Sequence, residues 1–449
     1  MNLLIALLIC AGPVDGEVLR QLLAVDTSHG GETKALEPVA QRFKSAGVPV
    51  QILESSAGRG NLIARIAGTG AHKPLLLLAH IDVVPVEGQK WNTPPFQPSE
   101  KDGFLYARGV SDDKAMASAI VAVALELAKS GQRPSRDVIV ALTAGEETGG
   151  FAGVRWLVEN HFDLIDAELA LNEGGNLQLD ESSQRVDQVG LQVSEKTFQT
   201  FRLTARGKGG HSSVPPTDVD PALTLARALV RVGEFRFPAH ALPEVKGQLA
   251  AAAEREKGPL ADALRSAAAS APRVAPADEQ VIGRDRVYNA LIRTTCVTTM
   301  LQGSPQDNVL PTAVEAQVNC RILPDESIDS VQAALAGAIA DPAVEIGRVD
   351  AFGSGGASPA GGEVERAVRA AAAKLWGDVR VLPILQAGAT DSRYLRQKGM
   401  VAYGISTAPG TLDDQRKGFG AHGANERRPV RWLPEGTNFL RQVVHELTH

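Results

Sequence analysis

Titratable side chains stand at the end of an apolar stretch early in this chain. The stretch LLLLAHIDVV, residues 75–84, runs into His80 and Asp82. On a strand, residues two apart face the same side, so both side chains would project together where the strand leaves the core. A buried charge has to be paired or bound to metal, and a carboxylate commonly holds the second ring nitrogen of a metal-ligating histidine. The motif therefore indicates either a metal ligand oriented by Asp82 or a hydrogen-bonded pair without metal.

Two further apolar stretches also end in acids. VIVALTAGEETGG, residues 138–150, reaches Glu146 and Glu147 between glycines, and AELALNEGG, residues 167–175, reaches Glu173. Adjacent carboxylates at the end of a buried strand repel each other, which raises the pKa of one of them. A metal ion beside one carboxylate would relieve this repulsion and leave the other free to accept a proton.

Two loops carry the remaining donors. Asp112 and Asp113 lie between an Arg-Gly turn and a predicted helix, where an aspartate ordinarily caps the helix. A nearby positive charge is needed beside adjacent acids, and either Lys114 or a metal would supply it. His422 lies in the glycine-rich loop GFGAHGANERRP, and such a histidine is more often an ordinary loop residue.

The combination is more specific than any one motif. In a parallel sheet the carboxyl ends of the strands meet at one edge, so these segments would place their donors together. Two histidines and three carboxylates suit two zinc ions, and cobalt and manganese accept the same donors. Such a pair of metals, roughly 3.5–4 Å apart, creates a bridging hydroxide nucleophile at neutral pH. The candidate donors are His80, Asp112, one of Glu146 and Glu147, Glu173 and His422.

The fold that must position these residues is predicted to be α/β. Apolar strands alternate with helices up to about residue 195, which indicates a mostly parallel central sheet covered by helices. Residues 114–131 read as one long amphipathic helix. From 196 to 352 a β-α-β-β-α-β order predicts an inserted, ferredoxin-like α+β domain with one free sheet face. We therefore expect a catalytic domain over 15–195 and 353–449, interrupted by a lid or dimerisation domain over 196–352.

Composition excludes several classes of protein. The 449 residues carry 46 basic and 52 acidic side chains, a net charge of −6, which is no basic field for nucleic acid. Three cysteines are too few for a disulfide framework and have no zinc-knuckle spacing. No run is long enough to span a membrane. Residues 1–14 include a short apolar segment that favours export, as a signal-peptide remnant, over a cytoplasmic location.

The motifs AHIDVVP, ARGVSDDK, AGEETGG, NEGG, GKGGHSS and GATDSRYL occur in this order over nearly the whole chain. Together they resemble the co-catalytic zinc exopeptidases that include glutamate carboxypeptidase, succinyl-diaminopimelate desuccinylase, acetylornithine deacetylase and aminoacylase. The inserted region and LNEGG look most similar to the carboxypeptidase S branch. One departure is Ala115, where many members have glycine.

The resemblance implies a role for each donor. Asp112 would bridge two zinc ions, and the peptide bond that follows it is cis in the family. His80, oriented by Asp82, would bind the first zinc with Glu173. His422 and Glu147 would bind the second, while Glu146 would act as the general base.

The resemblance also implies residues that contact the substrate. His211 would stabilise the oxyanion, and in dimeric relatives this histidine reaches the partner's active site. Asn308 would bind substrate, and Arg321 suits a substrate carboxylate, because a guanidinium group grips one through two hydrogen bonds. Gly388 and Thr390, with Asp391, would shape the pocket floor.

We therefore expect a dinuclear zinc hydrolase that cuts a peptide or amide bond in small substrates with a free carboxylate, as carboxypeptidases and dipeptidases do. The alternative within the enzymes is an N-acyl-amino-acid amidohydrolase, and the chain does not separate the two. A non-catalytic metal-binding scaffold is the alternative outside them, although Glu146 is present. A homodimer is expected from the His211 motif, with neither nucleic acid nor a membrane span.

Overall fold

A computed structural model describes residues 14–449 apart from 181, 350–352, 354, 412–413 and 415–416. The predicted signal segment, except for Val14, lies outside the described residues. Two compact units divide the chain. The first holds residues up to 193, 358–382 and 390–449, and the second holds 194–357 together with a short return over 383–389. Among the described residues, no helix is both long and apolar enough to cross a membrane.

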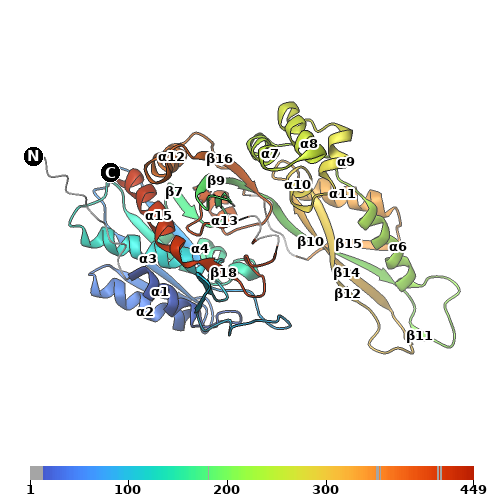
Figure 1. Ribbon diagram of the computed structural model, residues 1–449. Coiled ribbons are helices and arrows are strands. Elements are labelled where there is room, and N and C mark those ends of the chain that lie inside the picture. The colour runs from blue at the N-terminus through green and yellow to red at the C-terminus, as the bar shows by residue number, and fades with distance from the viewer. Residues whose placement is uncertain (1–13, 181, 350–352, 354, 412–413, 415–416) are drawn as a thin grey trace, which may run out of the picture. The chain divides into compact units, whose positions relative to one another are not determined.

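The first unit is built on a nine-stranded sheet in the order β1-β2-β6-β3-β7-β17-β9-β16, with β8 paired to β9. Figure 1 labels β7, β9 and β16 among these strands. The central strands β6, β3, β7 and β17 are parallel, which confirms the predicted parallel core, while the pairs β1–β2, β2–β6 and β17–β9 are antiparallel. The strands are β1 Val50–Glu54, β2 Gly60–Ile66, β3 Leu75–His80, β6 Val138–Thr143, β7 Leu169–Asn172, β8 Asn176–Leu179, β9 Val186–Glu195, β16 Arg380–Gln386 and β17 Val401–Gly404.

Helices cover both faces of this sheet, which is why its central strands are apolar on both sides. In β3, Leu75 and Leu77 belong to one hydrophobic core, and Leu76 and Leu78 belong to another. The first core includes helices α1 Val14–Leu23, α2 Glu32–Ser45, α3 Lys114–Lys129, α12 Glu363–Trp376 and α15 Leu433–Thr448. The second includes α4 Val154–Asn160, α5 Phe162–Ile165 and α13 Ser392–Gln397.

Helix α3 differs from the prediction. It was expected to be amphipathic, but every residue from Lys114 to Leu125 is buried. The helix packs against α1 and α15 as well as against β3, so no side of its first turns faces water. The predicted polar stripe is therefore wrong for most of its length.

The second unit contains a four-stranded antiparallel sheet in the order β12-β14-β10-β15. Its chain order is β-α-β-β-α-β, with α6 and α11 in the core on one face, as expected for the ferredoxin-like arrangement. The elements are β10 Thr197–Arg206, α6 Pro221–Glu234, β12 Thr295–Gln302, β14 Ala313–Ile322, α11 Ile328–Ile339 and β15 Val344–Arg348.

Two insertions extend this unit. Between α6 and β12, four helices form a hydrophobic core of their own: α7 Pro243–Arg255, α8 Gly258–Ser270, α9 Pro276–Ile282 and α10 Arg286–Leu291. The short strands β11 Gly210–His211 and β13 Val309–Leu310 pair antiparallel.

A disulfide joins Cys296 to Cys320 in the second unit, although the cysteine count argued only against a disulfide framework. The register of β12 against β14 places the two residues directly opposite each other. Spacing along the chain does not reveal such a cross-strand neighbour, so this bond was not predicted from the sequence.

Candidate metal centre

The strand register explains why three of the predicted donors meet. His80 is the last residue of β3, lies opposite Thr143 of β6, and is only 2% exposed. Because β3 pairs parallel with both β6 and β7, all three strands end at the same edge of the sheet. The chain that leaves β6 reaches Glu146 and Glu147 there, and the chain that leaves β7 reaches Glu173.

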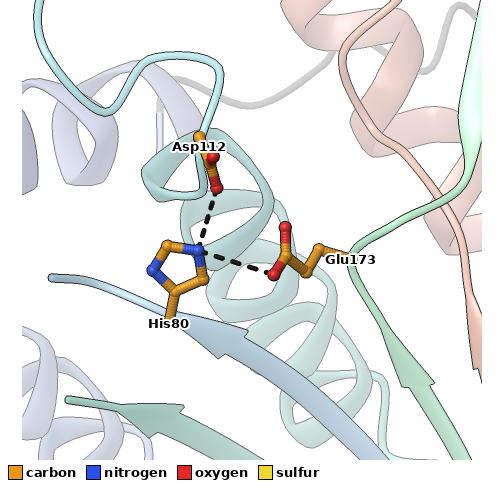
Figure 2. A group of neighbouring side chains, drawn as sticks. All are labelled: His80, Asp112 and Glu173. Carbon is orange, nitrogen blue, oxygen red and sulfur yellow. Dashed lines mark hydrogen bonds and ion pairs between the residues drawn. The ribbon is translucent and has the colours of Figure 1, made fainter. Parts of the chain in front are cut away.

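His80, Asp112 and Glu173 form one group of possible ligands, which Figure 2 shows. Nε2 of His80 lies 2.9 Å from Oδ1 of Asp112 and 3.7 Å from Oε1 of Glu173. The other ring nitrogen, Nδ1, lies 3.0 Å from the backbone oxygen of Asp82. Since a carbonyl only accepts hydrogen bonds, Nδ1 carries the proton in the neutral ring, and that form leaves the Nε2 lone pair for a cation.

Asp112, Glu147 and His422 form the second group. Nε2 of His422 lies 3.0 Å from Oε1 of Glu147 and 3.1 Å from Oδ2 of Asp112. Asp112 therefore serves both groups through different oxygens, and within each group the donor atoms lie within 4.8 Å of one another. The peptide bond between Asp112 and Asp113 is cis, as the resemblance implies.

The charges of this centre fit two divalent cations. Burial raises the pKa of Glu173 well above its usual range, and the Asp112 charge adds to this. Hydrogen bonds to Asp112 and Glu147 raise the pKa of His422 to about 10. Burial opposes protonation of His80, but the charges of Glu173 and Asp112 still raise its pKa well above the usual range. A raised pKa means that the group binds a proton more tightly, and here both a carboxyl group and the two histidines do so. This indicates an excess of negative charge at the centre, which cations would offset.

Asp82 organises the turn that follows β6. Its Oδ1 accepts the backbone N–H of Glu146 at 3.0 Å, and its Oδ2 accepts that of Glu147 at 3.1 Å. The turn begins after Gly145, whose φ of 70° favours glycine. The side chain of Asp82 lies 3.5 Å from Nδ1 of His80, so its backbone oxygen is the closer partner of the histidine.

Glu146 belongs to neither group of ligands. Burial raises the pKa of its carboxyl well above the usual range, and the nearby charges of Asp391, Glu147 and Asp112 add to this. This carboxyl therefore lies among the charges of the candidate ligands without belonging to either group.

Two predicted pocket residues fall on either side of a unit boundary. Thr390 belongs to the first unit, is 4% exposed, and accepts the N–H of Ser392 through Oγ1 at 3.2 Å. The helix that follows is tied to the Glu146 turn, because the hydroxyl of Tyr394 donates to the Gly149 oxygen at 2.6 Å. Gly388 belongs to the return that packs with the second unit.

The remaining predicted residues lie in the second unit, where His211 and Asn308 are neighbours. His211 pairs with Val309, and the next residue, Ser212, donates its N–H to the Asn308 oxygen at 3.0 Å. Nδ1 of His211 accepts the N–H of Ser213 at 3.1 Å, so the proton of the neutral ring is on Nε2.

Arg321 lies on β14, separate from this pair, with its guanidinium 4.8 Å from the centre of the Phe198 ring.

A buried ion pair that was not predicted from the sequence lies in the loops of the candidate ligands. Nη1 of Arg108 lies 2.8 Å from Oε2 of Glu426, and the two side chains are 1% and 0% exposed. Glu426 follows His422 in the same loop, and Arg108 precedes Asp112 in another. The only signal in the sequence was that Arg108 and Glu426 each lie within one of the quoted motifs. Neither residue type is unusual in a loop, so their pairing could not be inferred.

Comparison with known proteins gives a family match over most of the chain. The model of peptidase family M20/M25/M40 matches residues 76–446. The N-fatty-acyl-amino acid synthase/hydrolase PM20D1 of Xenopus tropicalis is 30% identical over 297 residues, which cover 62% of this chain and 54% of the relative. The chain thus spans about half the length of that relative.

Two other similarities agree with the family match. A probable succinyl-diaminopimelate desuccinylase of Staphylococcus aureus (strain MRSA252) is 26% identical over 321 residues, which cover 70% of this chain and 69% of the relative. Among solved structures, the M20 family metallo-carboxypeptidase Sso-CP2 of Sulfolobus solfataricus has a TM-score of 0.69 at 17% identity. That match covers 96% of this chain and 98% of the other.

Proposed function

Because the chain belongs to peptidase family M20/M25/M40 and is a hydrolase, we propose that it cuts an amide bond in small substrates that carry a free carboxylate. One observation carries the proposal: two groups of ligands, each with one histidine, meet at Asp112. Its Oδ1 lies beside His80 and its Oδ2 lies beside His422. When bound, two zinc ions would offset the surrounding carboxylates, polarise the scissile carbonyl and lower the pKa of a water molecule.

Glu146 moves the proton in this proposal. Asp82 accepts two backbone N–H groups of its turn, and these bonds fix the backbone from which the Glu146 side chain extends. The raised pKa of this buried carboxyl supports proton uptake from water and its later return to the leaving amine. The roles of His80, Glu173, Glu147 and His422 as metal ligands belong to the same proposal.

N-acyl-amino acids are the favoured substrates within this class. The frog relative is named for N-fatty-acyl-amino acids, and the Staphylococcus relative for a succinylated amino acid. Both names describe an acyl group joined to an amino acid, an amide with a nearby carboxylate. Dipeptides, the substrates that the sequence motifs favoured first, become the second candidate, because they contain the same bond and the same carboxylate.

A substrate panel on zinc-loaded protein tests the proposal. It compares a long-chain N-acyl amino acid, an N-acetyl amino acid and a dipeptide, each with a free carboxylate and as the matched methyl ester. We expect turnover of the free acids, highest for an N-acyl-amino acid, and weak turnover of the esters. No hydrolysis of any compound by metal-loaded protein would contradict the proposal and favour a non-catalytic scaffold.

We also propose a homodimer joined through the second unit. β12 is an edge strand, and its Val297, Met300 and Leu301 are 61%, 59% and 68% exposed. A long, apolar and unpaired edge is a template for pairing with another strand. A dimeric mass by sedimentation, lost in Leu301→Lys, supports this, and a monomeric wild type contradicts it.

In such a dimer, we propose that His211 of one chain serves the metal centre of the other as an oxyanion donor. Its Nε2–H is the donor that this role needs. Mixing inactive Glu146→Gln with inactive His211→Ala tests the proposal. Recovered activity in the mixture supports a role across the dimer, and its absence contradicts one.

A further inference from the structure

Two short strands bring the loops of Asp112 and His422 side by side. β5 (Phe104–Tyr106) pairs antiparallel with β18 (Arg427–Pro429) in a small sheet that is completed by β4 (Ser99–Lys101). The chain that leaves β5 soon reaches Asp112, and the chain that enters β18 comes from His422. The two ligand loops therefore start from one pair of strands.

Glu426 links its own loop to the Asp112 loop through three hydrogen bonds. Its Oε1 accepts the N–H of Ser111, the residue before Asp112, at 2.6 Å. Its Oε2 accepts the N–H of Gly109 at 3.1 Å and a proton of Arg108 Nη1 at 2.8 Å. The carboxylate is wholly buried, and both of its oxygens are occupied by protein donors. It is therefore satisfied as a structural acceptor and is not a further metal ligand.

Arg108 carries the link back to the loop of His422. Its Nη2 lies 3.4 Å from the His422 oxygen, and its Nη1 lies 3.3 Å from the Gly423 oxygen. Nη2 also donates at 2.6 Å to Oε1 of Gln89, and Nε2 of Gln89 donates to the His422 oxygen at 3.0 Å. The backbone oxygen of His422 thus accepts hydrogen bonds from two side chains, those of Arg108 and Gln89.

We propose that the Glu426–Arg108 ion pair, with Gln89, is a positioning device that fixes Asp112 and His422 relative to each other and so sets the affinity of the second metal site. The inference rests on the proposed metal-dependent function. A ligand held in place before binding has less freedom to lose, and partners that orient metal ligands typically contribute 10–100-fold in metal affinity. The His422/Glu147 site is held through both loops, so it depends on the pair more than the His80/Glu173 site does.

Two variants weaken the device in different ways. Glu426→Gln keeps the shape but turns an NH₂ group toward one set of donors, either Ser111 or Arg108 and Gly109. Gln89→Leu removes its bonds to the His422 oxygen and to Arg108, together with the one that it accepts from Trp91 Nε1 at 3.1 Å. It leaves the buried ion pair intact, so it preserves the fold even where Glu426→Gln does not.

The matched control is Glu363→Gln. Its partner Arg136 is also buried, at 1% exposed, although Glu363 itself is 42% exposed, and their Nη2–Oε1 distance is 2.6 Å. Arg136 precedes the first residue of β6, whereas the metal ligands lie at or after the carboxyl ends of the strands. This pair therefore lies at the amino ends of the strands, away from the metal centre.

Zinc titration of metal-free protein is the main measurement, with His422→Ala used to assign the second binding step. The visible absorption of the cobalt-loaded protein reports the ligand geometry independently of activity. We expect the second step to weaken 10–100-fold in Glu426→Gln and several-fold in Gln89→Leu. The first step should change less, the cobalt spectrum should alter in both variants, and Glu363→Gln should match wild type.

Zinc affinities within twofold of wild type in both variants would overturn the inference. An equal loss in Glu363→Gln would also overturn it, because the effect would then be one of general stability. If wild type itself fails to bind two metals, the proposed function fails first, so the two failures are distinguishable.

Discussion

Asp82 and Glu146 are joined by a hydrogen bond in which the backbone N–H of Glu146 donates to Oδ1 of Asp82 at 3.0 Å. The neighbouring N–H of Glu147 donates to the other carboxylate oxygen, at 3.1 Å. One buried side chain thus fixes the backbone of both glutamates. Glu146 is the proposed proton carrier, and Glu147 is a proposed metal ligand. The paired glutamates act from one turn, and Asp82 sets the geometry of that turn.

Replacing Asp82 by alanine should therefore lower both kcat and zinc affinity, each by about 10–100-fold. Asp82→Asn keeps one oxygen acceptor and should lose less. Kinetics and zinc titration measure the two effects. Asp137→Asn is the matched control, because Asp137 accepts the N–H of Gly68 at 2.7 Å beside the opposite ends of the strands. Normal kcat and zinc affinity in Asp82→Ala would contradict this role.

Glu146→Gln and Glu147→Gln should separate proton transfer from metal binding. We expect Glu146→Gln to keep about two metals per chain while kcat falls by about 10²–10⁴, the usual contribution of a general base. Glu147→Gln should instead lose the second metal. Metal analysis and steady-state kinetics on both variants give the answer, and loss of metal from Glu146→Gln would mean that the two roles are reversed.

Zinc binding should release protons and tighten as pH rises. Hydrogen bonds to Asp112 and Glu147 raise the pKa of His422 to about 10, so the metal-free histidine is protonated at neutral pH. Zinc requires the neutral ring, so the apparent affinity should rise at least about tenfold per pH unit from pH 7 toward pH 10. Calorimetry in buffers of different ionisation enthalpy measures the released protons. An affinity that does not change over this range would show that His422 is not a ligand.

Glu32 should make the unfolding free energy fall as pH rises from 4.5 to about 7. Its side chain is wholly buried, and its Oε1 lies 3.0 Å from Nη2 of Arg59. Burial raises the pKa of Glu32 from 4.5 to about 7. The folded state therefore holds this proton after the unfolded chain has lost it, which favours the folded state at low pH. Relative to Glu32→Gln, wild type should lose about 3 kcal/mol between pH 4.5 and pH 8.

Urea unfolding at several pH values measures this difference. The exposed Glu37, on the same helix, provides the control Glu37→Gln, whose profile should run parallel to that of wild type. Parallel profiles for wild type and Glu32→Gln would contradict the assignment.

The residues that end buried strands were predictable from sequence. His80 and Glu173 follow runs of apolar residues, and parallel pairing of such strands brings their ends to one edge. His422 was different, because a glycine-rich loop has no periodicity. The donor count made it a candidate ligand, but only the resemblance assigned it to the second zinc with Glu147. The structure then placed it 3.0 Å from Glu147.

Contacts that depend on long-range pairing were not predictable. Arg108 and Glu426 meet because three-residue strands pair, and such short strands leave no pattern in a sequence. The same limit hid the pairing of Cys296 with Cys320 across two strands. The burial of α3 is a different case: residues 115–125 are apolar all round apart from Ser118, a pattern that itself indicates a buried helix, so this prediction was wrong although the sequence carried the signal.

The most direct test of the central claim is an anomalous diffraction map of zinc-loaded crystals, measured at the zinc absorption edge. The account predicts two peaks per chain, one about 2.0–2.2 Å from donor atoms of His80, Asp112 and Glu173, and the other equally close to Asp112, Glu147 and His422. A map with no peak at Asp112, or with a single peak that leaves one histidine without metal, would contradict it.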